Sequence, residues 1–109
     1  MATSRITIDV TTDENKVPVA INWTADDGGI SQQAVSAMVL SMWNPKGHAA
    51  MRMDLWTKDM SVEEMRSFVV QTMMTLADPY ERATSDKDHA TAVRGFTQEF
   101  AKRIGVLEG

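Results

Sequence analysis

With 109 residues, 43% of them apolar and 24% charged, the chain has the size and composition of one ordinary globular domain. Its net charge of −4 is spread along the sequence, and the longest basic cluster is Lys102-Arg103, which argues against a nucleic-acid-binding face. The absence of cysteine excludes disulfides, thiolate metal sites and thiol catalysis.

The N-terminal segment runs directly into a strand pattern without an apolar signal core. No apolar run approaches the ~20 residues that a membrane helix requires. We therefore expect a soluble, cytoplasmic protein without direct membrane insertion.

Two alternating segments, at about 4–12 and 17–24, predict an antiparallel β-hairpin. With a four-residue turn at 13–16, the large apolar residues of both strands lie on one face. A register shift of one residue would destroy this match. The predicted cross-strand pairs are Ile6 with Trp23, Ile8 with Ile21 and Val10 with Val19.

The segment Ser31–Trp43 fits either a helix face or a strand. We prefer a strand at about 37–43, because Asn44-Pro45-Lys46-Gly47 has type I turn chemistry and a second strand at about 49–57 follows it. The predicted pairs on the inner face are Met38 with Met53, Leu40 with Met51 and Met42 with Ala49. The predicted pairs on the outer face are Ala37 with Asp54 and Val39 with Arg52, and Trp43 and Trp56 lie there too.

The second half is predicted to be helical, at about 61–77 and 86–104. A capping box at Ser61 begins the first helix, and Asp78-Pro79 is expected to interrupt it. Gly105 is expected to end the second helix in a left-handed conformation. Strands followed by helices predict a single α+β domain over residues 1–109, in which two C-terminal helices pack on one face of a four-stranded antiparallel sheet.

Catalytic and metal-binding patterns are weak. His48 and His89 are the only histidines, and they lie in different segments. No glycine-rich phosphate loop and no nucleophile elbow is present. We expect no enzymatic activity, no catalytic residue, no metal and no cofactor.

The outer face of the second hairpin is the candidate binding surface. Arg52, Asp54 and Trp56 share it with Trp43, and tryptophan and arginine dominate the energetics of protein interfaces. The alternative is an ordinary solvated sheet face. The chain also holds nine methionines, most of them on predicted inner faces, where they favour a methionine-rich core over an adaptable binding groove.

The same residues carry a family resemblance. The runs Ala37–Trp43, Met51–Met60 and Ser61–Met65, with Glu81-Arg82-Ala83-Thr84 between the helices, are similar to the gliding-motility protein GldC family of Bacteroidetes. Pro79 and Ser85 depart from the family pattern. The resemblance covers nearly the whole chain and implies a small, non-enzymatic cytoplasmic accessory protein.

We therefore expect an adaptor that binds a protein partner in gliding motility or the associated secretion machinery. With the residues of the resemblance added, the candidate partner-binding residues are Trp43, Arg52, Asp54, Trp56, Lys58, Glu81 and Arg82. Three alternatives stay open: a secretion-chaperone-like dimer that holds client segments, a small-ligand-binding domain with a pocket between sheet and helices, and a homodimer formed through the second sheet face.

Overall fold

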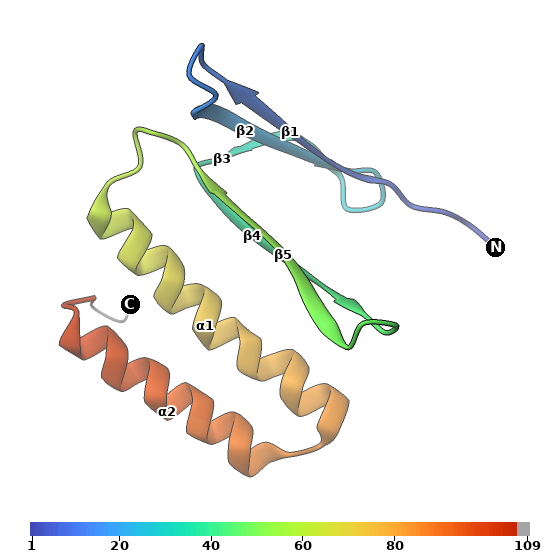
Figure 1. The fold of residues 1–109 in the computed structure, drawn as a ribbon. Helices are drawn as coiled ribbons and strands as arrows, with labels where there is room; N and C mark the ends of the chain where they lie inside the picture. The colour runs from blue at the N-terminus through green and yellow to red at the C-terminus, as the bar shows by residue number, and fades with distance from the viewer. Residues whose placement is uncertain (107–109) are drawn as a thin grey trace. The chain divides into compact units, whose positions relative to one another are not determined.

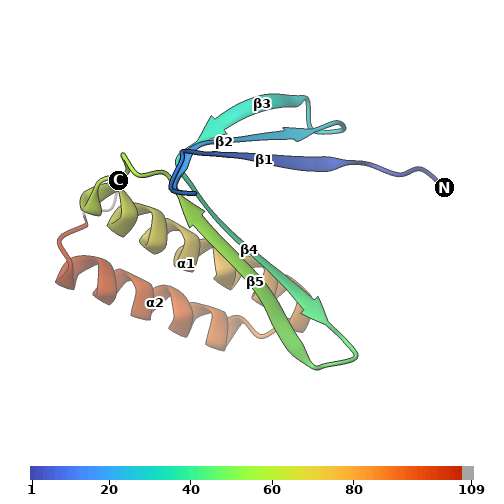
Figure 2. The same cartoon turned by 45° about the horizontal axis from the view of Figure 1, so that its top comes forward.

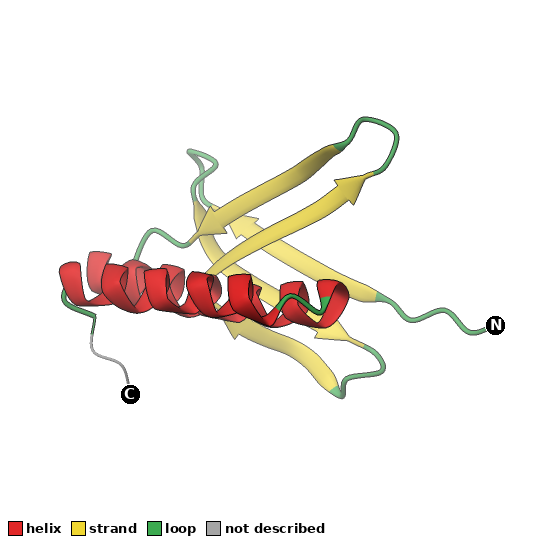
Figure 3. Cartoon of the chain, turned by 90° about the horizontal axis from the view of Figure 1, so that it is seen from below, coloured by secondary structure: helices red, strands yellow, loops and turns green. Residues whose placement is uncertain are grey.

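The computed structural model describes residues 1–106, which fall into two compact units with the boundary between Met60 and Ser61 (Figure 1). The first unit contains the strands, and the second contains the helices. All the strands therefore precede the helices in the chain, as the colours of Figure 1 show, and Figure 3 distinguishes the strands in yellow from the helices in red. The predicted α+β class is confirmed.

Five strands form two antiparallel sheets in the first unit, rather than the predicted single sheet of four. One sheet has the order β1-β2-β3, and the other pairs β4 with β5 as a separate ribbon (Figure 2). The strands are β1 (Ile6–Thr12), β2 (Pro18–Ala25), β3 (Ile30–Val35), β4 (Ala37–Asn44) and β5 (Ala49–Trp56).

The segment that could be either helix or strand consists of two strands. Val35 pairs with Ile21 and Gln33 pairs with Trp23, so β3 extends the first sheet. Ser36 alone separates β3 from β4, and its carbonyl accepts the Thr57 amide at 2.9 Å. The strand β3 was not predicted, because the polar run Ser31-Gln32-Gln33 occupies half of its positions and hides the two-residue period.

The predicted register of the first hairpin is wrong by two residues, although the predicted face is correct. Ile8 pairs with Trp23 and Val10 pairs with Ile21. Two local features each add one residue. Asp13, rather than Thr12, bonds Val17 and closes the turn. A bulge between Thr11 and Thr12 leaves Val19 of β2 without a partner, because Thr11 pairs with Ala20 and Thr12 pairs with Pro18.

The second hairpin shows the same two-residue difference. Asn44 pairs with Ala49, so the turn is Pro45–His48, one residue later than predicted. The Asn44 side chain accepts the Lys46 amide at 3.1 Å, and His48 takes a left-handed backbone at φ 50°. Because the difference is an even number, each side chain stays on its predicted face. The observed pairs include Met38 with Leu55, Leu40 with Met53, Met42 with Met51, Val39 with Asp54 and Ala37 with Trp56.

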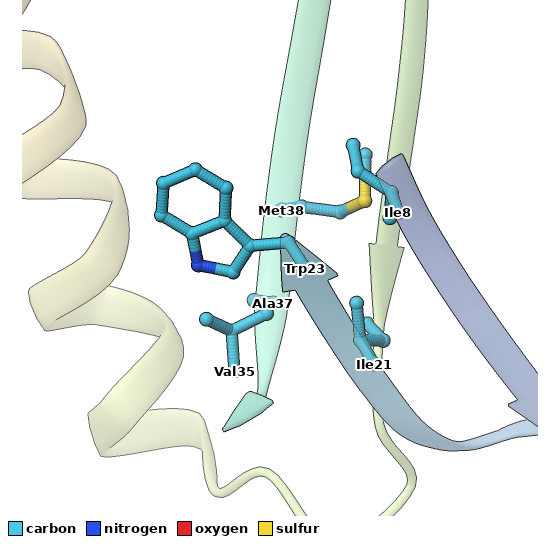
Figure 4. Close-up of a pocket in the computed structure, with 6 residues that line it drawn as sticks. All are labelled: Ile8, Ile21, Trp23, Val35, Ala37 and Met38. Carbon is cyan, nitrogen blue, oxygen red and sulfur yellow. The ribbon is translucent and has the colours of Figure 1, made fainter. Parts of the chain in front are cut away.

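The core of the strand unit lies where the two sheets meet. Ile21 is 2% exposed, and its neighbours surround an apolar hollow of about 160 Å³ (Figure 4). The hollow is lined by Ile8, Ile21, Trp23, Val35, Ala37 and Met38. Residues of β4 thus complete a core that β1, β2 and β3 begin.

The helical unit is an antiparallel pair of helices, α1 (Val62–Thr84) and α2 (Lys87–Arg103). The predicted capping box at Ser61 and Glu64 is confirmed. The predicted break at Asp78-Pro79 is wrong, since α1 continues through Pro79. Arg94 of α2 bonds the carboxylates of Asp78 and Glu81 on both sides of the proline, at 2.8 and 2.9 Å, and these bonds help to hold the backbone helical there.

Small side chains are buried in this helical pair, as close helix packing requires. Those buried are Val70, Ala77, Ala90, Thr97 and Ala101. After α2, Gly105 has φ 78°, its amide bonds the Lys102 carbonyl at 3.2 Å, and the Val106 amide bonds the Ala101 carbonyl at 2.8 Å. This is the Schellman pattern, so the predicted left-handed cap is confirmed.

Candidate functional site

One face of the β4–β5 ribbon carries the central candidate residues. We call it the tryptophan face. The register places eight side chains on it: Ala37, Val39, Ser41, Trp43, Ala50, Arg52, Asp54 and Trp56. Side chains alternate between the two faces of a regular strand, and this alternation alone brings the eight residues together. The sequence pattern shows the same alternation, so it identified the face correctly.

The two tryptophans lie at opposite ends of this face. Trp43 is opposite Ala50 near the turn, and Trp56 is opposite Ala37 at the other end. Ala50 and Trp56 are six positions apart on β5, which corresponds to roughly 20 Å of extended strand. The predicted single patch, with Val39 beside Arg52, is therefore corrected to a strip with an aromatic residue at each end.

Both tryptophans are available to a partner. Trp43 is 64% exposed and Trp56 is 51% exposed, and each has only an alanine opposite it on the neighbouring strand. The Trp43 ring meets the edge of His48 with the ring centroids 6.3 Å apart. Val39, which is 52% exposed, lies between the two ends on β4.

Charged side chains occupy the middle of the strip. Arg52 is opposite Ser41, and Asp54 is opposite Val39. Both are exposed, and within residues 1–106 neither forms an ion pair. The tryptophan face therefore offers one cation and one anion, two residues apart, to an incoming molecule.

Lys58 is held at the base of the ribbon. Its ammonium lies 3.2 Å from the Asp13 carboxylate, and its amide bonds the Pro18 carbonyl at 3.1 Å. The Val17 amide is the largest cause that lowers the pKa of the Asp13 carboxyl, and the Asn15 amide and Lys58 lower this pKa further. Lys58 thus joins the β4–β5 ribbon to the β1–β2 turn, a structural role that the sequence did not indicate.

Thr57 was also missed as a structural residue. It is 4% exposed, its hydroxyl donates to the Asp59 carboxylate at 2.6 Å, and its amide donates to Ser36. The run Asp54–Lys58, which carries the strongest family resemblance, therefore divides in two. Asp54 and Trp56 belong to the tryptophan face, Leu55 lies on the opposite face, and the last two residues anchor the ribbon.

Glu81 and Arg82 belong to the helical unit and not to the strand unit. Glu81 is engaged with Arg94, whereas Arg82 is exposed in the last turn of α1. The carboxylates of Asp78 and Glu81 raise the pKa of Arg94. Glu81 is best explained as part of the contact between α1 and α2.

The opposite face of the ribbon differs from the prediction. It carries four methionines and two leucines, and we call it the methionine face: Met38, Leu40, Met42, Met51, Met53 and Leu55. Burial was expected, but Met42, Met51 and Met53 are 59%, 62% and 52% exposed. The predicted methionine-rich core is wrong for these three residues, because the hairpin has no third strand and the rest of the strand unit leaves them uncovered.

A polar cluster links the two helices where α2 begins. Asp86 caps α2 by accepting the His89 amide at 3.1 Å, and its second oxygen lies 2.7 Å from both the Tyr80 hydroxyl and the His89 ring. The Tyr80 hydrogen bond is the largest cause that lowers the pKa of Asp86, and the same bond raises the pKa of Tyr80. The cap itself could have been inferred from Asp86 beginning the helix, but the bond to Tyr80 depends on the helix pairing.

Chemical sites are not evident in the described part of the chain. Residues 1–106 contain no group of three or more side chains able to hold a metal ion. Neither described helix combines the length and the apolar content that crossing a bilayer requires. The apolar hollow where the two sheets meet, at about 160 Å³, is smaller than the ~300 Å³ at which ligand pockets usually begin.

These features define an α+β protein with a strand unit, a helical pair and an exposed ribbon bearing aromatic and charged side chains. The family model for gliding motility-associated GldC-like proteins matches residues 18–106. The chain therefore belongs to the GldC-like family. Comparisons with curated proteins and with solved structures find no match.

Proposed function

We propose that this protein is a cytoplasmic, non-enzymatic accessory that binds a protein partner in gliding motility or its associated secretion machinery. Membership of the GldC-like family supports the gliding context. The observation that carries the binding role is the tryptophan face. Its two tryptophan side chains are each at least half exposed, and Arg52 and Asp54 lie between them without an ion-pair partner in residues 1–106.

The physical argument rests on what such a strip gains on binding. An exposed tryptophan removes a large apolar area from water when a partner covers it, and it loses little conformational entropy. Arg52 and Asp54 add orientation, because an incoming surface must match one positive and one negative charge. The regular β4–β5 ladder holds all of these groups in a fixed order.

We expect Trp56→Ala and Trp43→Ala to fold normally and to lose partner capture, because both side chains are at least half exposed. Each loss should correspond to about 2 kcal/mol or more of binding free energy, as for interface hot spots. Affinity capture from the native cells, quantified by mass spectrometry, identifies the proteins that are lost. Binding of the purified candidate then gives the affinity.

The matched control is Phe96→Ala. Phe96 is 65% exposed but lies on α2, outside the tryptophan face. Capture that falls equally in the Phe96 variant would indicate general instability rather than a binding site. Undiminished capture by both tryptophan variants would rule out the tryptophan face.

The methionine face favours a second candidate, a chaperone-like role in holding client segments. Met42, Met51 and Met53 form a flexible, polarizable apolar surface that can adapt to different sequences. In this case Met51→Lys should abolish client binding while Trp56→Ala preserves it. The two candidates therefore predict opposite results from the same pair of variants.

A further inference from the structure

The outer edge of β5 is not paired with a strand in the described structure, since β5 pairs with β4 alone, and β2 begins at Pro18 beside the end of this edge. The Thr57 amide points toward β4 and bonds Ser36, whereas the next amide, that of Lys58, points the other way and bonds Pro18. Backbone groups alternate in direction along a strand. The residues whose N–H and C=O groups point to the open edge are therefore Ala50, Arg52, Asp54 and Trp56.

Several of the usual features that prevent strand pairing are missing from this edge, and its charged residues are Arg52 and Asp54. The β4–β5 register is regular along its whole length, and β5 contains no proline and no lysine. A two-stranded ribbon is marginal by itself in water and gains stability from a third strand. The edge of β5 is accordingly competent to pair with another strand.

The charges on β5 identify its partner. In an antiparallel pair of two β5 strands related by a two-fold axis at Met53, Arg52 faces the partner's Asp54, and Asp54 faces the partner's Arg52. The side chains form both ion pairs, and the backbone groups of the same two residues already point to the open edge, where they can bond the second strand. The strand is thus complementary to a second copy of itself, as an isologous interface requires.

Neighbouring registers do not have this property. With the axis at Arg52, two arginines face each other, and with the axis at Asp54, two aspartates do. Like charges directly opposite each other destabilise a strand pair. A shift by a single residue would place the tryptophan face of one copy beside the methionine face of the other. The axis at Met53 is the register that pairs arginine with aspartate.

We propose that the open edge of β5 is a homodimer interface, in which two copies pair antiparallel about Met53 and form the continuous sheet β4-β5-β5-β4. A hollow of about 340 Å³ lies beside the end of this edge, lined by Lys16, Val17, Pro18, Asp54, Leu55, Trp56 and Lys58. In the dimer, the partner's Ala50 lies opposite Trp56.

Charge reversal with mixing tests the register directly. Arg52→Asp places two acids against each other across the interface, and Asp54→Arg places two bases there, so each variant alone should dimerise about tenfold more weakly or worse. Mixing the two variants restores both ion pairs. We expect sedimentation equilibrium to show monomers for each variant, a dimer for the wild type and a dimer for the mixture.

The controls are Glu14→Arg and Arg5→Asp, which change charge by the same amounts at exposed positions outside β5. Both should dimerise like the wild type, and circular dichroism should show that all variants fold. A monomeric wild type overturns the proposal. So does a mixture that stays monomeric while its two components are folded.

A single cysteine gives an independent test, because the chain contains no cysteine. Two Met53 residues on the axis occupy a non-hydrogen-bonded pair, with Cα atoms about 4.5 Å apart, which a disulfide can span. Met53→Cys should therefore form a covalent dimer under mild oxidation. Leu40→Cys, which lies opposite Met53 on β4, should not. Crosslinking through Leu40 instead would place the interface on the β4 edge and overturn the proposal.

The dimer goes beyond the proposed partner-binding role, and the two fail separately. The charge-reversed variants do not separate the two proposals, because Arg52 and Asp54 also belong to the tryptophan face. Loss of capture in Trp43→Ala, which changes β4 and not the open edge of β5, with dimerisation retained would support both proposals. A monomeric wild type that still captures its partner would overturn the dimer alone.

Discussion

Asp86 illustrates how one carboxylate at a helix start can serve several partners at once. It caps α2, accepts the Tyr80 hydroxyl of α1 and lies beside the His89 ring. The hydrogen bonds from Tyr80 and the His89 amide favour its ionised form and lower its pKa below the ordinary 3.8. The helical pair therefore gains stability from the charge of Asp86 as well as from its shape.

This lowered pKa predicts a pH dependence with a definite sign. The contribution of Asp86 to stability is complete above its unfolded pKa of about 3.8, and it is lost as the pH falls through the lower folded value. We expect the melting temperature of Asp86→Asn to depend less on pH between about 6 and 2 than that of the wild type.

Asparagine is the informative replacement because it remains a good N-cap. Asp86→Ala, which removes both cap and charge, should lower the melting temperature at neutral pH more than Asp86→Asn does. An identical pH profile for wild type and Asp86→Asn would contradict the assignment.

Helix α1 shows how an element can tolerate a residue that normally ends it. Pro79 removes one backbone donor and crowds the preceding turn, which costs about 3 kcal/mol in a helix interior. Arg94 bonds the side chains on both sides of it, and Ala77 is buried two residues earlier. Tertiary contacts therefore extend the helix past the position where local preference predicts a break.

Pro79→Ala is expected to stabilise the helical unit by about 1–3 kcal/mol, because it restores the missing donor without disturbing the bonds to Arg94. Chemical denaturation followed by helical circular dichroism measures the change. Pro45→Ala in the β4–β5 turn serves as the control and should give no such gain, since Pro45 lies outside any helix. A destabilised Pro79→Ala protein would show that α1 needs the proline.

At the scale of the whole chain, the sequence predicted what depends on periodicity. Alternation identified β1, β2, β4 and β5 and the faces of their side chains, and capping chemistry identified Ser61 and Gly105. It did not predict what depends on long-range pairing. The polar strand β3 is recognisable only from its pairing with β2.

The residues of the candidate site also fall into those that periodicity predicts and those that depend on long-range contacts. The tryptophan face follows from strand alternation and was therefore predictable. The roles of Lys58 and Glu81 follow from contacts with Asp13 and Arg94, which lie far from them in the sequence. The exposure of Met51 and Met53 was missed because a methionine-rich strand face indicates an apolar surface without indicating whether anything covers it.

Self-association through reciprocal ion pairs predicts a dependence on salt for the full chain. The dissociation constant should rise by several-fold between low ionic strength and about 0.5 M salt, because exposed ion pairs are screened. Light scattering at matched protein concentrations gives this change. The mixed pair of Arg52→Asp and Asp54→Arg should respond more strongly than the wild type, because one copy then carries both acids and the other both bases. A dimer insensitive to salt in both cases would argue that apolar contacts alone hold it.

The β4–β5 ribbon is attached to the first sheet at one end only. There the Pro18 carbonyl holds the Lys58 amide and the Asp13 carboxylate holds the Lys58 ammonium, while the turn at Pro45–His48 lies nine positions from Ser36 and Thr57, roughly 30 Å along the strands. The ribbon is mechanically a cantilever with Trp43 near its tip. A partner that pulls on the tip therefore loads these base hydrogen bonds with the leverage of the ribbon's full length, so they, rather than the ladder, are the first bonds to feel a sideways force.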